Sequence, residues 1–524
     1  MKRSATTITT SQKKKKASAK EAVVSINYIP NDPLAGGSAP PTRRKNPRAN
    51  RPSSRATFQF FDAEPEGLAS PGTPQFLFWQ AREAALTALT AWETSTGNFL
   101  RWQGNRKTIP FIQNAVVQLG AQQTLNAFYN RASFQFFQAT AGTKTIFSGE
   151  STDVVAHEIG HGILDAIRPQ LIESPLLEVG AFHEAFGDCV ALVTAFLDLK
   201  SRTAVRSSVN SRNFLETTAE DLSDAIRRVQ SNHNAAEPRH AKNTLQWILP
   251  TTLPSNGGPG VLINEEHSFA RVFSGSFYDL IVKLAGPSPT AAKIRTAAIK
   301  AGKLLAAGAA TAPIGARFYQ AIGRAMVMAD DSTNGGANRE LIKAAFLGHG
   351  VLLGTSAMMS PVVALAGAKP TVSATKAGLS SSARRDLVER LGAPRGARMS
   401  VSSLDIGDER VAHATVTRDV QLGSVASALK GVVVQVTNSV LVGASGGRAA
   451  VLGSVPNVDT TTDEVLSFVE SLVKNKRILT RRPKNPPKRH RVEAMPPFTH
   501  EIVRIGGRKE LRRRAFACGC CFEG

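Results

Sequence analysis

Two histidines and a glutamate in the stretch "VVAHEIGHGILD" (154–165) have the types and spacing of a metal-dependent hydrolytic site. On a helix, His157 and His161 lie one turn apart on the same face, so both imidazoles could hold one ion, about 2.0–2.1 Å away if it is zinc. Glu158 would approach the open coordination position and could accept a proton from water there. Because a catalytic zinc needs three protein ligands and one exchangeable position, the pattern requires a third ligand elsewhere.

The next predicted helix supplies a candidate for that ligand. Its stretch "HEAFGD" (183–188) places Glu184 and Asp188 one turn apart on one face of an otherwise apolar helix. Charged side chains are seldom buried unless they are paired or bind a metal. Glu184 could be the third ligand, and Asp188 could accept the free ring N–H of a histidine ligand. The two helices together predict a zinc site.

The same residues are also compatible with roles other than catalysis. A His-Glu-x-x-His pattern can arise by chance, and ion pairs between neighbouring helices also place acids beside histidines. A further possibility is a structural zinc site, which normally has four protein ligands. His183, beside Glu184, could be the fourth ligand of such a closed site.

Several patches of the chain resemble, in the same order, the thermolysin-like metallopeptidases, the gluzincins whose third ligand is a glutamate. The two zinc motifs are the most specific part of this resemblance, which covers about residues 58–352. The patches are "LNAFYN" (125–130), "DVVAHEIGHGILD" (153–165), "HEAFGD" (183–188), "HSFARVFSGSFYDLI" (267–281) and the stretch 317–352.

The resemblance implies an α+β thermolysin-like zincin domain that acts as a zinc-dependent endopeptidase. It implies that His157, His161 and Glu184 hold Zn²⁺ and that Glu158 is the general base. It places His267 where the family has a histidine that stabilises the oxyanion of the reaction.

The family also suggests roles for residues around the metal ligands. Asn126 and Ala127 match the edge strand that binds the substrate backbone in the family. Asp188 and Asp165 match acids that hydrogen-bond to the metal ligands and support them. Arg239 is the candidate for the family's substrate-binding arginine.

Several features distinguish this chain from the family. The stretch "RPQLIESPLLEV" (168–179) lacks the tyrosine expected after the zinc helix, and His183 replaces the usual asparagine. No run of acids after Asp188 resembles the family's calcium site, so calcium is not expected. The chain before "LNAFYN" leaves no room for a large pro-domain, and no secretory signal is recognisable. These features predict an intracellular, cytoplasmic relative whose rate is lower than that of secreted members.

Apolar periodicity predicts the elements that position these residues. An amphipathic helix is expected over 73–97, followed by strands over 132–149 with a turn at 141–142. A second module with β-branched runs and a helix over 461–478 is expected to be α/β. Further helices are expected over 151–168, 178–199, 216–230, 267–285, 290–308, 314–329 and 337–348. The predicted organisation is a disordered basic tail (1–57), the metallopeptidase domain (58–352), a linker (353–395), a small α/β module of unknown role (396–478) and a basic, cysteine-containing tail (479–524).

The net charge of +23 is concentrated in the two tails. Residues 1–55 contain 13 basic and 2 acidic residues, and residues 474–524 contain 15 and 4. Such tails are either solvated and disordered or contact nucleic acid, anionic lipid or an acidic partner. A second hypothesis is therefore a weak or inactive zincin that acts as a binding protein. Only four cysteines are present, and no run reaches 18 apolar residues, so neither a disulfide framework nor a transmembrane helix is expected.

Overall fold

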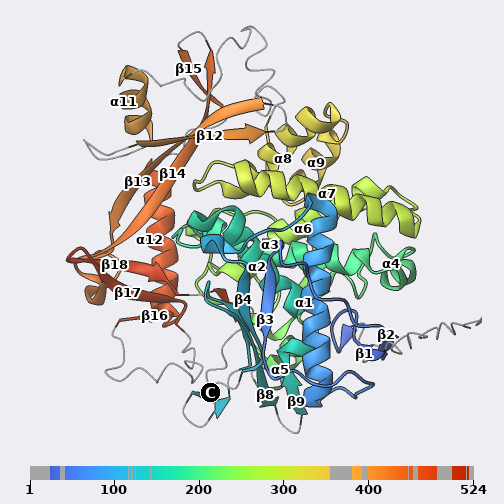
Figure 1. Ribbon diagram of the computed structural model, residues 1–524. Coiled ribbons are helices and arrows are strands. Elements are labelled where there is room, and N and C mark those ends of the chain that lie inside the picture. Colours follow the sequence, from blue (N-terminus) through green and yellow to red (C-terminus); the bar gives the residue numbers. More distant parts are fainter. Residues whose placement is uncertain are drawn as a thin grey trace, which may run out of the picture.

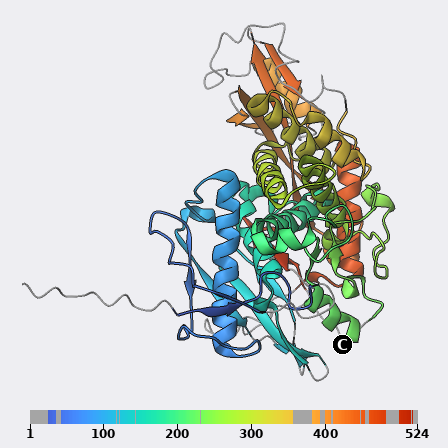
Figure 2. The ribbon, with the colours of Figure 1, turned by 90° about the vertical axis from the view of Figure 1, so that its right-hand side faces the viewer.

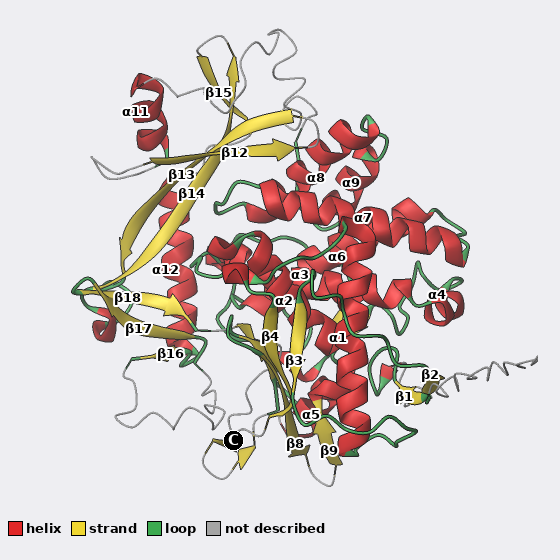
Figure 3. Ribbon diagram, in the orientation of Figure 1, coloured by secondary structure: helices red, strands yellow, loops and turns green. Residues whose placement is uncertain are grey.

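A mixed β-sheet, a group of helices and a second sheet make up the molecule (Figure 1, Figure 3). The α+β class predicted from the sequence is confirmed. The structure, a computed structural model, describes residues 24–35, 42–115, 118–119, 122–123, 125–141, 144–229, 231–354, 381–391, 399–406, 409–445, 448–452, 458–480, 498–514 and 516–517.

The first sheet carries the predicted substrate-binding strand close to one edge. Its strands follow the order β19-β7-β8-β4-β3, and β9 pairs with β8. The strands β3, β4 and β8 run parallel, whereas β7 is antiparallel to β8 and β19 is antiparallel to β7. The strand at the β7 edge of the sheet, β19, therefore comes from the C-terminal end of the chain. The bounds are β3 Thr57–Phe60, β4 Thr108–Ala115, β7 Ala127–Tyr129, β8 Phe134–Ala141, β9 Lys144–Phe147 and β19 Phe516–Ala517.

Helix α1 (Pro74–Thr96) connects this sheet with the helical part of the molecule. Its N-terminus is capped by the Thr73 hydroxyl, which accepts from the Phe76 amide, and Pro74 occupies the first turn, where a missing N–H costs nothing. The helix ends at Gly97, whose φ of 85° is accessible to glycine. It packs against α2 (Thr152–Ile167) and α3 (Leu177–Leu197), the two helices that carry the predicted zinc motifs.

The helical part surrounds α3, whose apolar residues make it the central helix of the core. Helix α3 contacts α2, α6, α7 and α8 as well as α1. It is the one helix of the described residues that is long and apolar enough to cross a membrane, and its apolar window is entirely buried inside the protein, as in the core helix of many globular proteins. The other helices are α4 Leu199–Val205, α5 Glu220–Val229, α6 Glu266–Ala285, α7 Ala291–Thr311, α8 Phe318–Asn334 and α9 Arg339–Leu347.

Two glycines let α2 and α3 approach each other closely. A Cβ atom at Gly160 would lie 2.7 Å from the Gly187 Cα, and a Cβ atom at Gly187 would lie 2.7 Å from the His157 ring. Either distance is shorter than real Cβ contacts allow, so larger side chains here would push the helices apart. The glycine inside "HEIGH" therefore has a packing role that sets the distance between the two zinc motifs.

The second sheet forms the C-terminal part of the described chain. Its strands follow the order β12-β13-β14-β18-β17-β16, with β15 paired to β14, and helix α12 lies beside them (Figure 1). Figure 2 shows this sheet extending away from the helices in a second view. The bounds are α11 Ser381–Arg390, β12 Met399–Ile406, β13 Glu409–Gln421, β14 Val432–Ser445, β15 Arg448–Leu452, α12 Val458–Lys474, β16 Ile478–Leu479, β17 His500–Ile505 and β18 Arg508–Arg513.

This second sheet and α12 pack directly on the helical part. The Asn264 amide donates to Ser467 Oγ at 2.9 Å, and Ser471 Oγ donates to the Asn264 carbonyl at 2.7 Å. The Ser439 amide donates to the Ile314 carbonyl at 2.9 Å. One continuous group of buried apolar side chains includes residues from both parts. The segment 396–478 is therefore attached to the predicted catalytic domain through a shared core.

The disorder expected for the two basic tails is wrong for the parts that the structure describes. In the first tail, β1 (Ile26–Tyr28) pairs with β2 (Arg43–Lys45) and packs on α1. In the second tail, β17, β18 and β19 are paired strands. Long-range pairing overrides the local composition in these segments. Most of the linker expected at 353–395 lies outside the described residues, and so do residues 1–23 and 481–497.

Two short antiparallel strand pairs complete the described fold. Strand β5 (Gln118–Leu119) pairs with β6 (Gln122–Gln123), and β10 (Thr217–Thr218) pairs with β11 (Arg239–His240).

Candidate active site

The two zinc motifs face each other across the α2–α3 contact. His157 Nε2 lies 3.2 Å from Glu184 Oε2, and His161 Nε2 lies 3.7 Å from the same oxygen. Two atoms bound to one tetrahedral zinc at about 2.0–2.1 Å would be about 3.3–3.4 Å apart. All three side chains are buried. The distances from the two histidines to this oxygen are therefore compatible with ligands of one metal ion.

Unsatisfied polar atoms also point to a metal at this place. His161 Nε2, Glu184 Oε1 and both carboxylate oxygens of Glu158 are buried without a hydrogen-bond partner in the described part of the chain. Ligand atoms of His157, Glu158 and His161 lie within 4.8 Å of one another. Burial without a partner costs several kcal/mol for a charged group, of the order of 3–5 when an ion pair is broken. A bound cation would remove that cost, so the residues present fit a metal.

Asp188 holds His157 from the side opposite to Glu184. Its Oδ1 lies 2.9 Å from His157 Nδ1 and accepts from Arg239 at 3.0 Å, and its Oδ2 accepts from Ser274 Oγ at 3.0 Å. Burial opposes ionisation of this carboxyl group, but Arg239 and His157 outweigh it and hold the pKa of Asp188 well below its usual range. An ionised Asp188 keeps the proton of His157 on Nδ1, which leaves Nε2 available to a metal. Asp188 therefore contacts the ring of His157, the histidine that the sequence predicts as a ligand.

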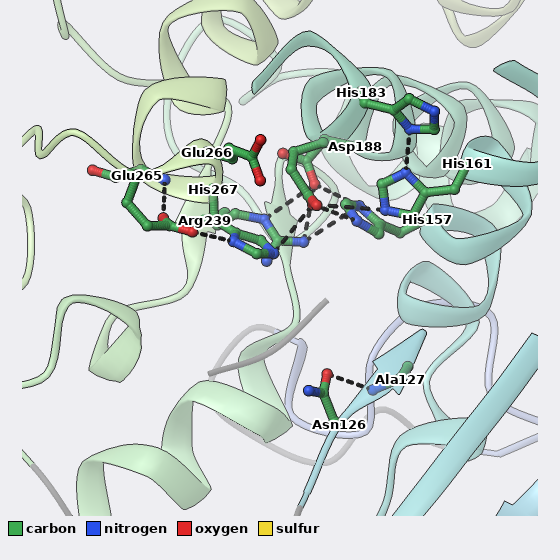
Figure 4. Close-up of polar contacts among 12 residues, drawn as sticks. Asn126, Ala127, His157, His161, His183, Asp188, Arg239, Glu265, Glu266 and His267 are labelled. Carbon is green, nitrogen blue, oxygen red and sulfur yellow. Dashed lines mark hydrogen bonds and ion pairs between the residues drawn. The ribbon is translucent and has the colours of Figure 1, made fainter. Parts of the chain in front are cut away.

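His183 supports His161 in the same way. Its Nδ1 lies 2.8 Å from His161 Nδ1, on the ring edge away from Glu184. Burial holds the pKa of His183 well below its usual range, so the neutral ring can accept the Nδ1 proton of His161. Figure 4 shows the rings of His183, His161 and His157 in succession. This orientation places His183 behind a ligand, where it does not approach the metal position as a fourth ligand would.

His267, at the N-terminus of α6, reaches the same site. Its Nε2 lies 3.2 Å from Glu184 Oε2, and its Nδ1 lies 2.6 Å from Glu265 Oε1. Burial lowers the pKa of His267, but the carboxylates of Glu184 and Glu265 outweigh burial and raise it to about 10. Glu265 also caps α6 by accepting from the Ser268 amide at 2.9 Å. Its carboxylate therefore fixes both the helix start and the histidine ring.

Asp165 and Arg239 have contacts that differ from those expected for the roles predicted from the sequence. Asp165 accepts from the Tyr129 hydroxyl at 2.9 Å and from Arg131 at 2.7 Å, so it joins α2 to strand β7. The prediction that Asp165 supports a metal ligand is wrong, because it bonds to these two residues and to neither histidine ligand. Arg239 lies at the candidate metal site, where it contacts Asp188 and comes within 3.4 Å of His157 Nδ1.

The predicted substrate strand, β7, contacts helix α2 of the candidate metal site and is paired with another strand, β19. Ala127 begins β7, and Asn126 Oδ1 accepts from the Ala127 amide at 2.8 Å (Figure 4). Residues Phe516 and Ala517 pair with Tyr129 and Phe128 of this strand. The edge expected to receive a substrate is therefore already paired with another segment of this chain.

A second group of acids lies in the interior. Carboxylate oxygens of Asp32, Asp153 and Glu220 come within 4.8 Å of one another, and Asp32 Oδ2 and Glu220 Oε2 are buried without a hydrogen-bond partner in the described residues. Burial, together with the charges of Asp32 and Asp153, raises the pKa of Glu220 to about 10. These residues come from three segments, so no single stretch of the sequence indicates the group.

Several residues that complete the site have weak signals or none in the sequence. Glu265 is the N-cap of α6, but glutamate is not among the residues preferred there, so its sequence signal is weak. Ser274 lies one helical turn along α6 from Ala270 and has no distinguishing pattern. Phe516, whose ring stacks on His161 and His183, lies in a basic segment with no motif. Only the fold brings it against His161 and His183.

Comparisons with known proteins assign no family to this geometry. No protein-family model matches the chain, and no curated protein matches it significantly. The function is therefore inferred from the arrangement of the side chains.

Proposed function

We propose that this protein is a zinc-dependent endopeptidase with the architecture of a thermolysin-like zincin. The observation that carries the proposal is that His157 Nε2 and His161 Nε2 lie 3.2 Å and 3.7 Å from Glu184 Oε2, with the unpaired carboxylate of Glu158 nearby in the described part of the chain. Three ligands and an adjacent acid are the residue set of a catalytic zinc site with an open position.

Each side chain then has a task in peptide hydrolysis. A zinc ion held by these three ligands would supply Lewis acidity toward a peptide carbonyl and toward water. Glu158 accepts the proton of the attacking water and delivers it to the nitrogen of the leaving amine. His267, held by Glu265, donates a hydrogen bond to the oxygen of the carbonyl, on which negative charge develops. Asp188 and His183 keep the two histidine ligands in the tautomer that leaves each Nε2 free.

The strand β7 supplies the surface for a peptide. An extended substrate would pair with its backbone, which is the usual way in which a sheet edge binds a peptide. Asn126 and Ala127 lie at the start of this strand. Arg239 lies at the metal site beside Asp188 and remains the candidate for a contact with a substrate carbonyl.

A catalytically weak zincin that acts as a binding protein is the second candidate. The observation that favours it is the absence of a tyrosine from residues 168–179, since this residue would otherwise help to stabilise the oxyanion. A closed structural site is less well supported, because His183 faces the Nδ1 edge of His161. Nucleic-acid binding through the basic segments belongs to this second candidate and would be strongly salt-dependent.

The deciding experiment measures metal content and casein cleavage together, with and without a chelator, for the parent chain and for Glu158→Gln. The peptidase proposal predicts one zinc per chain in both proteins and cleavage by the parent alone. The loss of the base is expected to lower kcat by about 10²–10⁴-fold. Equal cleavage by both proteins would show that Glu158 is not the base, and zinc without cleavage in the parent would favour the binding protein.

A further inference from the structure

The strand β19 occupies the position where a substrate of the proposed peptidase would bind. Phe516 pairs with Tyr129 and Ala517 pairs with Phe128, antiparallel, along the outer side of β7. A strand at a sheet edge has free backbone groups that accept an added peptide. On this sheet those groups of β7 face Phe516 and Ala517, which lie almost four hundred residues further along the chain.

The side chain of Phe516 also covers one predicted metal ligand, His161, and the histidine behind it, His183. Its ring stacks on His183 at 4.1 Å between centroids and on His161 at 5.0 Å, with interplanar angles of 16° and 20°. Only 1% of Phe516 is exposed. A substrate side chain next to the scissile bond would need the same space against His161. The segment therefore imitates a bound peptide in both its backbone pairing and its side chain.

A buried anchor fixes this segment to the catalytic part. The Arg513 guanidinium lies 4.2 Å from the centroid of the Phe516 ring, donates to the Ile172 carbonyl at 3.0 Å and forms an ion pair with Glu266. Glu266 belongs to the first turn of α6, next to His267. A Cβ atom at Gly180 would overlap the Glu266 carboxylate, so the glycine on α3 makes room for this ion pair. Arg513 thus holds the chain three residues before the Phe516 ring.

We propose that Phe516 and Ala517 form a built-in competitive ligand of the active site, which a peptide substrate must displace from β7. This inference rests on the proposed peptidase function and adds a substrate class to it. The site accepts an extended peptide with an aromatic side chain over His161 and His183, followed by a small residue. Because the segment is tethered, its effective concentration is of the order of millimolar, so weakly bound substrates are excluded.

The first test compares Phe516→Ala with the parent in the full-length, zinc-loaded chain. Removing the ring is expected to raise kcat/KM for a fluorogenic peptide by about tenfold or more, because the tethered competitor then binds weakly. Phe61→Ala serves as the matched control, since Phe61 is 38% exposed and belongs to no part of the site. An unchanged or lower kcat/KM for Phe516→Ala, at equal zinc content, would overturn the proposal.

A second test supplies the segment in trans. The peptide Arg-Arg-Ala-Phe-Ala, the sequence of residues 513–517, is expected to inhibit Phe516→Ala competitively and to inhibit the parent much less. The same peptide with alanine in place of phenylalanine is expected to inhibit neither protein. Equal inhibition by the two peptides would contradict the role assigned to the aromatic ring.

A third measurement separates this proposal from the peptidase function itself. Hydrogen exchange of the amides of Ala127–Tyr129 is followed in the Glu158→Gln chain, with and without Phe516→Ala. Faster exchange in the double variant supports docking of the segment, even if no form of the protein cleaves peptides. In that case the peptidase function is what fails. Unchanged exchange overturns the docking, whatever the cleavage assay shows.

Discussion

The α2–α3 helix pair and the β13–β14 strand pair each bury a histidine, in opposite chemical surroundings. Burial lowers the pKa of His157 on α2, but the carboxylates of Asp188 and Glu184 outweigh burial and raise it to about 9. His413, on β13, bonds to the neutral Ser439 hydroxyl at 2.9 Å. Burial, with a smaller contribution from Arg168, lowers the pKa of His413 to about 4. A buried histidine is an ordinary core residue when its neighbours are neutral, and it indicates chemistry when several carboxylates converge on it.

The largest expected effect comes from removing a carboxylate from the α2–α3 helix pair. Glu184→Ala should abolish stoichiometric zinc binding, because two histidines cannot replace the three-ligand set of a catalytic site. Metal analysis after dialysis measures this loss. Glu178→Gln is the matched control, since Glu178 is also a buried acid of α3 but contacts Trp247 and the Tyr319 amide. Full zinc occupancy in Glu184→Ala would mean that the metal has another third ligand.

The second prediction concerns the pH dependence of folding stability that arises from His413 in the β13–β14 strand pair. The pKa of His413 is about 4 in the folded chain and near 6.5 in the unfolded chain. Between these pH values the unfolded state therefore binds more protons than the folded state. Stability should therefore fall as the pH drops from about 6.5 to 4, with His413 contributing about 3 kcal/mol of the loss. Urea denaturation of the parent and His413→Gln at pH 7 and pH 4 tests this contribution. If both proteins lose the same stability, the histidine is not buried in its neutral form.

A third prediction tests the close contact that brings the two zinc motifs together. Gly160→Ala should lower the free energy of unfolding by about 1–3 kcal/mol, because its Cβ would meet the Gly187 Cα at 2.7 Å. It should also weaken zinc binding, since the helices that carry the ligands would separate. Gly258→Ala is the control, because a Cβ there meets no atom within 4 Å in the described structure. Similar melting temperatures for the two variants would show that the helices adjust without cost.

The smallest expected effect comes from the residue behind His161. His183→Ala should weaken zinc affinity by about 10–100-fold, because the ligand loses the group that accepts its Nδ1 proton. His183→Asn should recover most of the affinity, since the amide oxygen can accept the same proton. Competition with a chelating dye measures both constants. Leu192→Ala, another truncation of a buried α3 side chain, should leave zinc affinity unchanged, and an equal loss there would point to packing instead.

The helices that carry the motifs could be predicted closely from the sequence. The helices expected over 151–168 and 178–199 are found at Thr152–Ile167 and Leu177–Leu197. The strands expected on either side of 141–142 are β8 and β9, which pair antiparallel, while residues 142 and 143 lie outside the described residues. These elements follow local rules, namely apolar periodicity, capping residues and glycines at turns. Local rules also place His157, His161 and Glu184 on helix faces that can meet.

The residues that escaped prediction depend on contacts between distant segments. Asp165 has the sequence position of a supporting acid, but the fold turns it toward Tyr129 and Arg131. Phe516 belongs to a basic segment whose composition predicts disorder, and its position comes from pairing with β7. Strand pairing and buried ion pairs join residues hundreds of positions apart, so no pattern within one segment indicates them.

The sequence by itself determined which residues could bind a metal, because residue type and helical spacing are local properties of the chain. It also determined the helices that carry them. Only the tertiary structure decided that His157 and His161 approach Glu184, that His183 lies behind His161, and that Phe516 stacks on both His161 and His183. Those relations depend on how closely α2 and α3 pack and on which strand completes the edge of the sheet. Both are set by packing and backbone hydrogen bonding across the whole molecule.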